Sequence, residues 1–383
     1  MRILCLTTSF PTSRQPWRGV FVRGWAQFME SQGATVRIVG PALPRVDTEM
    51  AYQGYRHFGD LLSGTGAPEF LEKHPVKGAL FGVGTCLSMA QQLRRNVQWA
   101  EHIVAHWLVP CALIAIATSG WRRTIPISCY AHGSDVALLE SFPPSIGRRL
   151  ARQIDSRCKV IIFVSEDLRS RFSSLLKRRP RSKHHVIPMG IHRPTPDSDF
   201  NNWVKHHSNG KKVVTTIGRH VPIKGLDVLL RALSGNDKVC WIAAGDGPVR
   251  ARLIQDAKRY NVNLVAPGEI TPSQREALLL QTDVFVQPSR RLERRQEGHP
   301  LSLSEALAAG VPSIVTQTGG LERIAETAGC KLVPCDDHQA LAHSIDALLS
   351  DQAERTALRA QHLDYGARMS WAQLGHEHYS ALC

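Results

Sequence analysis

Short apolar runs alternate with helix-compatible segments along the chain, and this alternation restricts the possible folds more than any other feature of the sequence. The runs contain few polar residues, which is typical of strands that are buried on both faces of a parallel sheet. Between them, residues such as Phe21, Trp25 and Phe28 recur at helical spacing. In the first half, the predicted strands are residues 3–6, 35–39, 102–105, 126–130 and 160–164.

The same alternation starts again after residues 194–199, a stretch rich in turn-forming residues that we predict to be a linker. A chain of 383 residues is also long enough for two domains. We therefore predict an α/β protein with two tandem Rossmann-like domains, residues 1–193 and 208–369, and a deep interdomain cleft. Ligands of such sheets bind at the carboxyl ends of the strands. The predicted strands of the second half are residues 213–217, 239–244, 263–266, 284–287 and 313–316.

The net charge of +14 indicates an anionic partner, and nucleic acid, anionic lipid headgroups and phosphorylated small molecules all fit it. The nine cysteines include no CxxC pair and no His at the spacing of zinc ligands, which favours a reducing cytoplasm and neither disulfides nor structural zinc. We see no export signal. The longest apolar stretch, residues 103–118, is interrupted by His106 and Pro110. We therefore expect a cytoplasmic protein without a membrane span.

The most informative segment runs from Glu297 to Pro312. Pro300 suits the first turn of a helix and Gly310 suits its carboxyl end. The amides from about Leu301 to residue 303 would then be open at the positive end of the helix dipole, where a diphosphate binds favourably. The two carboxylates, Glu297 and Glu305, are separated by seven residues, so we expect them to contact different parts of a ligand. The alternative is that both are ordinary solvated side chains.

Two further segments follow predicted strands. Arg219 and Lys224 lie between Gly218 and Gly225 at a strand–turn–helix junction, where a guanidinium and an ammonium can bind one pyrophosphate. His132 follows an apolar strand of the first half and precedes a glycine, a position that favours a ligand contact. Surface exposure of the two cations and a structural role for the histidine remain the alternatives.

Together these segments resemble the retaining GT-B glycosyltransferases of the group-one family, glycosyltransferase family four, and the resemblance covers nearly the whole chain. It implies that Glu297 contacts the donor sugar and that Glu305 binds the ribose. Arg219 and Lys224 would hold the donor phosphates, and His132 would lie beside the anomeric centre. The resemblance also implies donor contacts from Gly19, Gly218, Ile270 (through its backbone), Gly298, His299, Pro300, Leu301 and Ser302.

Some positions depart from the family pattern. Relatives often have two adjacent glycines where this chain has Arg18 and Gly19, and they often have Asn and Asp where it has Met189 and His192. By resemblance, residues 370–383 would form a helix that crosses back onto the first domain, although packing on the second domain is an open alternative.

The implied activity is transfer of a sugar from a nucleotide-diphosphate sugar to an acceptor hydroxyl with retention of configuration. The implied mechanism needs no catalytic metal and no cofactor. Expected acceptors are glycans or lipid-linked intermediates of cell-surface polysaccharide, lipopolysaccharide or glycolipid biosynthesis. The basic run at residues 177–183 could face an anionic membrane surface at the inner face of the cell membrane, or it could simply be solvated.

Two other functions remain open at this stage. A nucleotide-sugar epimerase of the same fold would consume donor without an acceptor and give an isomer. A nucleic-acid-binding protein would account for the positive charge, but the sequence has no recognisable RNA-binding motif and no aromatic platform among its basic clusters, so no nucleic-acid partner is expected.

Overall fold

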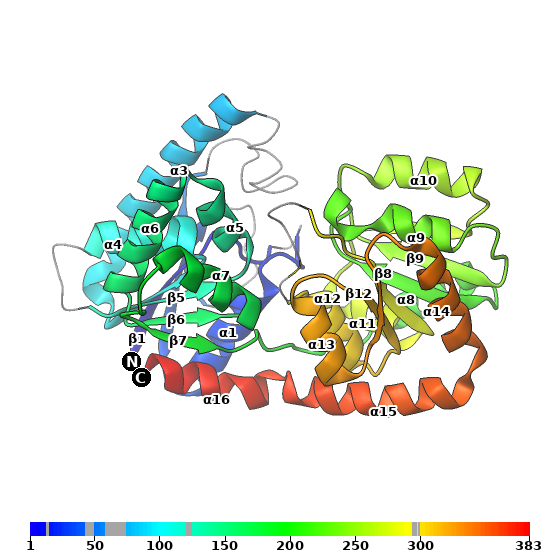
Figure 1. Cartoon of the computed structure of the whole chain (residues 1–383). Coiled ribbons are helices and arrows are strands. Elements are labelled where there is room, and N and C mark those ends of the chain that lie inside the picture. Colours follow the sequence, from blue (N-terminus) through cyan, green and yellow to red (C-terminus); the bar gives the residue numbers. More distant parts are fainter. Residues whose placement is uncertain (13–14, 43–49, 58–73, 120–124, 293–296, 298) are drawn as a thin grey trace. The chain divides into compact units, whose positions relative to one another are not determined.

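The computed structural model describes the chain except for residues 13–14, 43–49, 58–73, 120–124, 293–296 and 298. The chain divides into two compact units (Figure 1). The first unit comprises residues 1–190 and 371–383, and the second comprises residues 191–370. All nine cysteines have free thiols.

The first unit is a parallel sheet with helices packed around it, and its described part has seven strands. In spatial order the strands are β3 (Ala51–Tyr55), β2 (Thr35–Pro41), β1 (Arg2–Leu6), β4 (His102–His106), β5 (Ile127–Ala131), β6 (Val160–Phe163) and β7 (Lys183–Val186). The helices are α1 (Val20–Ser31), α3 (Pro75–Asn96), η2 (Val97–Trp99), η3 (Leu108–Ala112), α4 (Leu113–Ser119), α5 (Ser134–Ser141), α6 (Pro144–Arg157), α7 (Glu166–Leu176) and α16 (Trp371–Leu382).

The second unit repeats this plan with six strands in its described part, and all neighbouring strands are again parallel. In spatial order the strands are β10 (Leu264–Gly268), β9 (Val239–Ala244), β8 (Lys212–Ile217), β11 (Val284–Gln287), β12 (Ser313–Thr316) and β13 (Lys331–Val333). The helices are α8 (Ser198–Ser208), η4 (Pro222–Lys224), α9 (Leu226–Ala232), α10 (Arg250–Arg259), α11 (Pro272–Leu280), α12 (Leu301–Ala308), α13 (Gly320–Ala328), α14 (His338–Ser350) and α15 (Gln352–Arg368).

Burial explains why these runs form strands. Every residue of β4, β5, β6, β9, β11 and β12 is buried, as expected for central strands covered on both faces. Each sheet has its first strand in the interior, third from one edge, and reverses its strand order beside it, which is the doubly wound arrangement. The prediction of two Rossmann-like α/β domains is confirmed.

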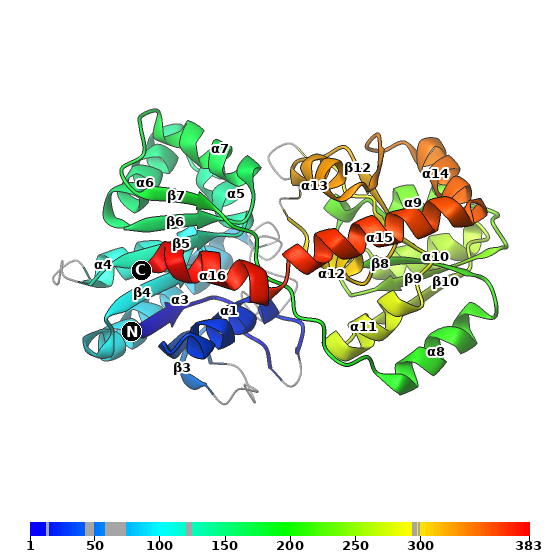
Figure 2. The same ribbon diagram turned by 90° about the horizontal axis from the view of Figure 1, so that it is seen from below.

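Helix α16 belongs to the first unit, where it packs beside α1 (Figure 2). The Trp371 indole fills the space that side chains at Gly24 and Gly190 would occupy. Farther along the helix, the buried His378 bonds the Tyr130 hydroxyl through Nδ1 at 3.1 Å and the Pro188 carbonyl through Nε2 at 2.9 Å. The two glycines thus leave room for Trp371, and the hydrogen bonds of His378 fix the helix to the first unit.

The second unit begins at residue 191, earlier than residue 208, the start of the second domain predicted from the sequence. The Ile191 amide bonds the Met369 carbonyl at 2.9 Å, and the Arg193 guanidinium bonds Glu276 and the Ala308 carbonyl. Helix α8 begins at Ser198, inside the expected linker of residues 194–199, and its N-cap Asp197 accepts a hydrogen bond from the Phe200 amide at 2.9 Å. Among helices of the described ranges, none has both the length and the apolar composition that a membrane crossing requires.

Candidate active site

The carboxyl edge of the second sheet brings together several of the residues singled out in the sequence. The strand order reverses between β8 and β11, which is where ligands of such sheets bind. The loop after β8 carries Gly218, Arg219 and Lys224, and the loop after β11 leads to Glu297 and helix α12.

A lysine and a glutamate meet at this edge. The Lys224 Nζ lies 2.8 Å from Glu297 Oε1, and the two side chains are 17% and 15% exposed. Gly218 has a φ of 147°, which favours glycine, and a Cβ there would lie 3.7 Å from the Lys224 Nζ. The Glu297 carbonyl accepts a hydrogen bond from the Gly320 amide at 2.9 Å, which fixes its loop to the start of α13. A positively charged group and a carboxylate that can accept hydrogen bonds from hydroxyl groups therefore lie side by side.

The turn after β9 supports the loop that carries Arg219. The Gly218 amide bonds the Ala244 carbonyl at 3.0 Å, and the His220 amide bonds the Asp246 carbonyl at 2.8 Å. A side chain at Gly245 would overlap the Gly218 carbonyl, so the close approach of the two turns requires glycine there. The Arg219 side chain is exposed on this braced loop.

The amino end of α12 differs in detail from the expectation. Pro300 is the N-cap rather than a first-turn residue, and its carbonyl accepts the amides of Leu303 at 3.1 Å and Ser304 at 3.3 Å. The Leu303 amide is therefore not open to a ligand. Within the described residues, the amides of Leu301 and Ser302 have no acceptor, and Pro300 supplies no side-chain cap. Two amides therefore remain at the positive end of the helix.

Glu305 lies one turn into α12 and is paired with Arg275 of α11. The Arg275 Nη1 lies 2.9 and 2.8 Å from the two Glu305 oxygens, and the side chains are 11% and 15% exposed. Burial raises the pKa of Glu305, and the adjacent guanidinium opposes this shift. Sequence reasoning missed Arg275, because it comes from a separate helix 30 residues earlier and no local motif marks it.

The other expected donor contacts have defined surroundings. His299 Nε2 lies 2.9 Å from the Ser304 hydroxyl, and burial lowers the pKa of His299 to about 4, so its imidazole is neutral at pH 7. The Ile270 side chain is buried in a core cluster, which leaves its backbone for ligand contacts. The Ser302 hydroxyl faces the Gln287 side chain at 3.5 Å. Gly298 lies outside the described residues.

In the first unit, a buried carboxylate fixes the loop that carries His132. Asp135 accepts hydrogen bonds from the amides of Leu108 at 2.8 Å, Gly133 at 2.9 Å, Val136 at 3.0 Å and His132 at 3.2 Å. Burial raises the pKa of Asp135, and these bonds oppose the shift. Asp135 therefore positions the backbone at the carboxyl end of β5, as a loop-orienting residue would.

The His132 ring is held by neighbouring rings. Its Nε2 lies 3.0 Å from His106 Nδ1, and its centroid lies 4.7 Å from that of Phe21 and 4.9 Å from that of Trp107. Burial lowers the pKa of His132 to about 3 and lowers that of His106 well below its usual value, so both rings are neutral at pH 7. The buried His106 Nε2 has no partner in the described residues, which favours His106 as the donor through Nδ1.

Gly19 has a structural requirement of its own. It is the N-cap of α1 with a φ of 61°, and a Cβ there would lie 2.5 Å from the Ser9 carbonyl oxygen. Glycine is therefore needed for the turn after β1 whether or not a ligand approaches it. In the described ranges, no group of three His, Cys, Asp or Glu side chains is arranged to hold a metal ion.

The chain matches two families that divide it near the boundary between its units. Residues 19–193 match the family described as Glycosyltransferase Family 4. Residues 197–363 match the family described as Glycosyl transferases group 1. Together the two matches cover most of the chain.

Curated relatives align over most of the chain at low identity. The putative teichuronic acid biosynthesis glycosyltransferase TuaC of Bacillus subtilis (strain 168) is 26% identical over 366 residues, which are 90% of this chain and 88% of that protein. The GDP-mannose-dependent alpha-(1-6)-phosphatidylinositol monomannoside mannosyltransferase of Mycobacterium tuberculosis (strain ATCC 25618 / H37Rv) is 27% identical over 340 residues, which are 83% of this chain and 81% of that protein.

Solved structures show the same fold. Sucrose-phosphate synthase from Thermosynechococcus elongatus superposes with a TM-score of 0.77 at 16% identity and covers 99% of this chain and 98% of its own. Anabaena HepE in complex with UDP-glucose superposes with a TM-score of 0.77 at 16% identity, covering 100% of this chain and 99% of its own.

Proposed function

The chain belongs to the group 1 glycosyltransferases, and from this premise we propose that it moves a sugar from a nucleoside diphosphate donor to an acceptor hydroxyl, with retention of configuration and without a catalytic metal. The observation that carries the proposal is the 2.8 Å approach of Lys224 to Glu297 beside the open amides of α12. A cation for phosphate and a carboxylate for sugar hydroxyls are both present at one sheet edge.

The proposed chemistry requires stabilisation of the leaving group. The bond between the anomeric carbon and the phosphate oxygen breaks, and its electron pair leaves with the diphosphate. Lys224, Arg219 and the amides of Leu301 and Ser302 would stabilise the growing negative charge, which is electrostatic preorganisation. The acceptor oxygen forms the new bond to the same face of the sugar, and its proton passes to the departing phosphate oxygen. No side chain has to act as a nucleophile.

The remaining roles follow from the chemistry of the groups. Glu297 would accept hydrogen bonds from the sugar hydroxyls. On binding of the donor, the ammonium of Lys224 would interact with both the Glu297 carboxylate and the phosphate. Glu305, held by Arg275, would accept hydrogen bonds from the ribose hydroxyls. For His132, we propose contact with the sugar near its anomeric centre, with the neutral ring that its surroundings favour.

The relatives suggest the substrate classes. One is named for GDP-mannose and a phosphatidylinositol mannoside, and another is named for teichuronic acid. HepE was solved with UDP-glucose. We propose a UDP- or GDP-linked hexose as the donor and a glycan or lipid-linked acceptor in cell-surface glycan biosynthesis. With a net charge of +14, we further propose that the enzyme works in the cytoplasm, peripherally at an anionic membrane surface.

The test is the turnover of Lys224→Ala, measured as nucleoside diphosphate release in the presence of acceptor and EDTA. We expect a loss of about 10²- to 10³-fold in kcat, the usual effect of removing one donor to a developing negative charge. Lys212→Ala is the matched control, because Lys212 is the first residue of β8, at the other end of the strand from the loop that carries Lys224, and pairs with Asp283 at 3.0 Å. Unchanged turnover in a folded Lys224→Ala variant would remove Lys224 from the mechanism, and activity that depends on added metal would overturn the metal-independent scheme.

A further inference from the structure

Helix α3 exposes a row of large apolar side chains. Val76, Leu80, Val83 and Leu87 are 73%, 67%, 61% and 68% exposed. Single exposed apolar residues are normal on a protein surface, whereas a contiguous row of them indicates an interaction site. We call these four residues the α3 stripe.

The α3 stripe occupies one side of the helix. Its spacings of four, three and four residues place all four side chains on one helical face. The opposite face is used by the first unit itself, since Thr85, Met89 and Leu93 are buried there and α3 packs on β2, β3 and α4. Figure 1 shows α3 along the outside of this unit. The stripe is therefore not part of the core.

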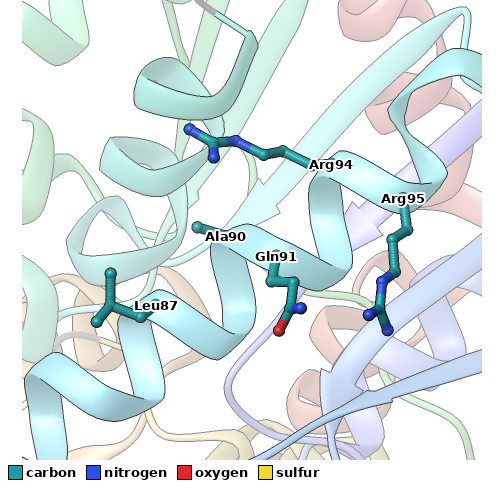
Figure 3. A pocket seen from close by; sticks show the side chains of 5 residues that line it. All are labelled: Leu87, Ala90, Gln91, Arg94 and Arg95. Carbon is teal, nitrogen blue, oxygen red and sulfur yellow. The ribbon is translucent and has the colours of Figure 1, made fainter.

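Arg94 continues the same face toward the end of the helix, and Arg95 lies on the adjacent side. Arg94 lies seven residues after Leu87, and Arg95 follows it in the last turn. Neither guanidinium has a partner within the described part of the chain, and α3 contains no acidic residue. A pocket of about 360 Å³ is formed by these two arginines with Leu87, Ala90 and Gln91 (Figure 3). Figure 3 shows the Gln91 and Arg95 side chains on one side of the helix and the Arg94 side chain directed away from them, so each guanidinium would bind a phosphate group of its own.

We propose that the α3 stripe and the arginine pair form the surface by which this chain binds an anionic lipid bilayer. The apolar side chains would enter the boundary between headgroups and acyl chains, and Arg94 and Arg95 would bind lipid phosphates. An apolar helical face with basic and no acidic residues is the pattern of helices that lie in a membrane interface. The choice of a bilayer as the occupant rests on the proposed function and on the positive charge of the chain.

The basic run at residues 177–183 is a weaker candidate for this role. The Arg178 guanidinium lies 2.6 Å from the buried carboxylate of Asp155. The Arg181 and Ser182 amides bond the same carboxylate at 3.0 and 3.2 Å. Part of this run therefore binds the buried carboxylate of Asp155, whereas Arg94 and Arg95 of α3 make no such interaction within the described part of the chain.

The experiment is flotation of the full-length chain with phosphatidylcholine vesicles that contain phosphatidylglycerol, in the absence of donor and acceptor. We expect Leu80→Ser/Leu87→Ser and Arg94→Gln/Arg95→Gln each to weaken vesicle binding at least tenfold. Ile146→Ser/Leu280→Ser is the matched control, since these residues are 47% and 42% exposed outside α3, and it should bind like the wild type. All variants should keep the wild-type melting temperature.

Three outcomes would overturn the inference. Wild-type binding by both α3 variants would exclude the surface, as would equal binding of the wild type to vesicles without phosphatidylglycerol. A wild-type dimer that Leu80→Ser/Leu87→Ser disperses, without vesicle binding, would show that a second copy covers the stripe. The proposed transferase activity is scored separately with a water-soluble acceptor, where the α3 variants should turn over normally, so failure of either idea is distinguishable.

Discussion

The Arg275–Glu305 pair yields the sharpest stability prediction. Arg275→Met removes the guanidinium while keeping an unbranched side chain on α11. It leaves the Glu305 carboxylate, which is 15% exposed, without the Nη1 donor that now lies 2.8 and 2.9 Å from its two oxygens. Because burial already raises the pKa of Glu305, loss of the cation should raise it further.

The size of the effect follows from the burial of the pair. Removing one partner of a buried ion pair costs about 3–5 kcal/mol, and the residual exposure of both side chains favours the lower end, about 3 kcal/mol. For a unit of this size, each kcal/mol lowers the melting temperature by roughly 2–4 °C, so we expect a decrease of about 6–12 °C. Arg275→Met/Glu305→Gln should recover most of this loss, since no uncompensated charge remains.

The assay is thermal unfolding of the wild type, Arg275→Met and Arg275→Met/Glu305→Gln by circular dichroism at pH 7. Arg252→Met is the matched control, because Arg252 pairs with Asp256 at 3.3 Å and is 84% exposed. That change should cost at most about 0.5 kcal/mol. A decrease of less than about 2 °C for Arg275→Met, or a double variant as unstable as the single one, would refute the inferred dependence of Glu305 on Arg275.

Two other predictions concern the first unit. Gly190→Ala should release α16, because the Cβ of the new alanine would enter the space of the Trp371 ring. The release would be measured as faster proteolysis of residues 371–383. Protection equal to that of the wild type would contradict this packing. Stability should also fall as the pH decreases from 6.5 to 4. His102 and His378 have folded-state pKa values lowered to about 4 by burial, so between pH 4 and 6.5 the unfolded state binds more protons. Each contributes a slope of about 1.4 kcal/mol per pH unit, which urea titrations at pH 7 and 5 would measure. Equal stability at both values would contradict it.

The sheets were predictable because their strands are buried on both faces and therefore appear as apolar runs. The helix expected at residues 301–309 is found at Leu301–Ala308. It was predictable because its apolar residues, Pro300 at its start and Gly310 after its end are all signals within the local sequence.

Helix α8 shows what the turn-former argument overlooked. Asp197 acts as an N-cap, and Phe200, Trp203 and Val204 give the helix one apolar face, so the helix begins inside a stretch that looks like a linker. The signal was present as a cap followed by helical spacing. The composition of residues 194–199 alone concealed it.

Contacts between residues from different helices and strands could not be predicted from local sequence patterns. The partner of Glu305 and the ring contact between His106 and His132 join residues from different elements, so spacing within a motif does not reveal them. The α3 stripe was hidden for another reason. A helix with apolar residues on both faces gives no periodic contrast that would tell the buried face from the exposed one.

The central claim is that Arg219 and Lys224 hold the donor diphosphate at the end of α12. Isothermal titration with UDP, GDP and the corresponding monophosphates, on the wild type and on Arg219→Ala/Lys224→Ala, tests it directly. The wild type should bind one of the diphosphates more tightly than its monophosphate, and the double variant should lose that preference with at least a tenfold weaker affinity, as expected for lost charge-assisted hydrogen bonds. A variant that keeps the wild-type preference for the diphosphate would contradict the account.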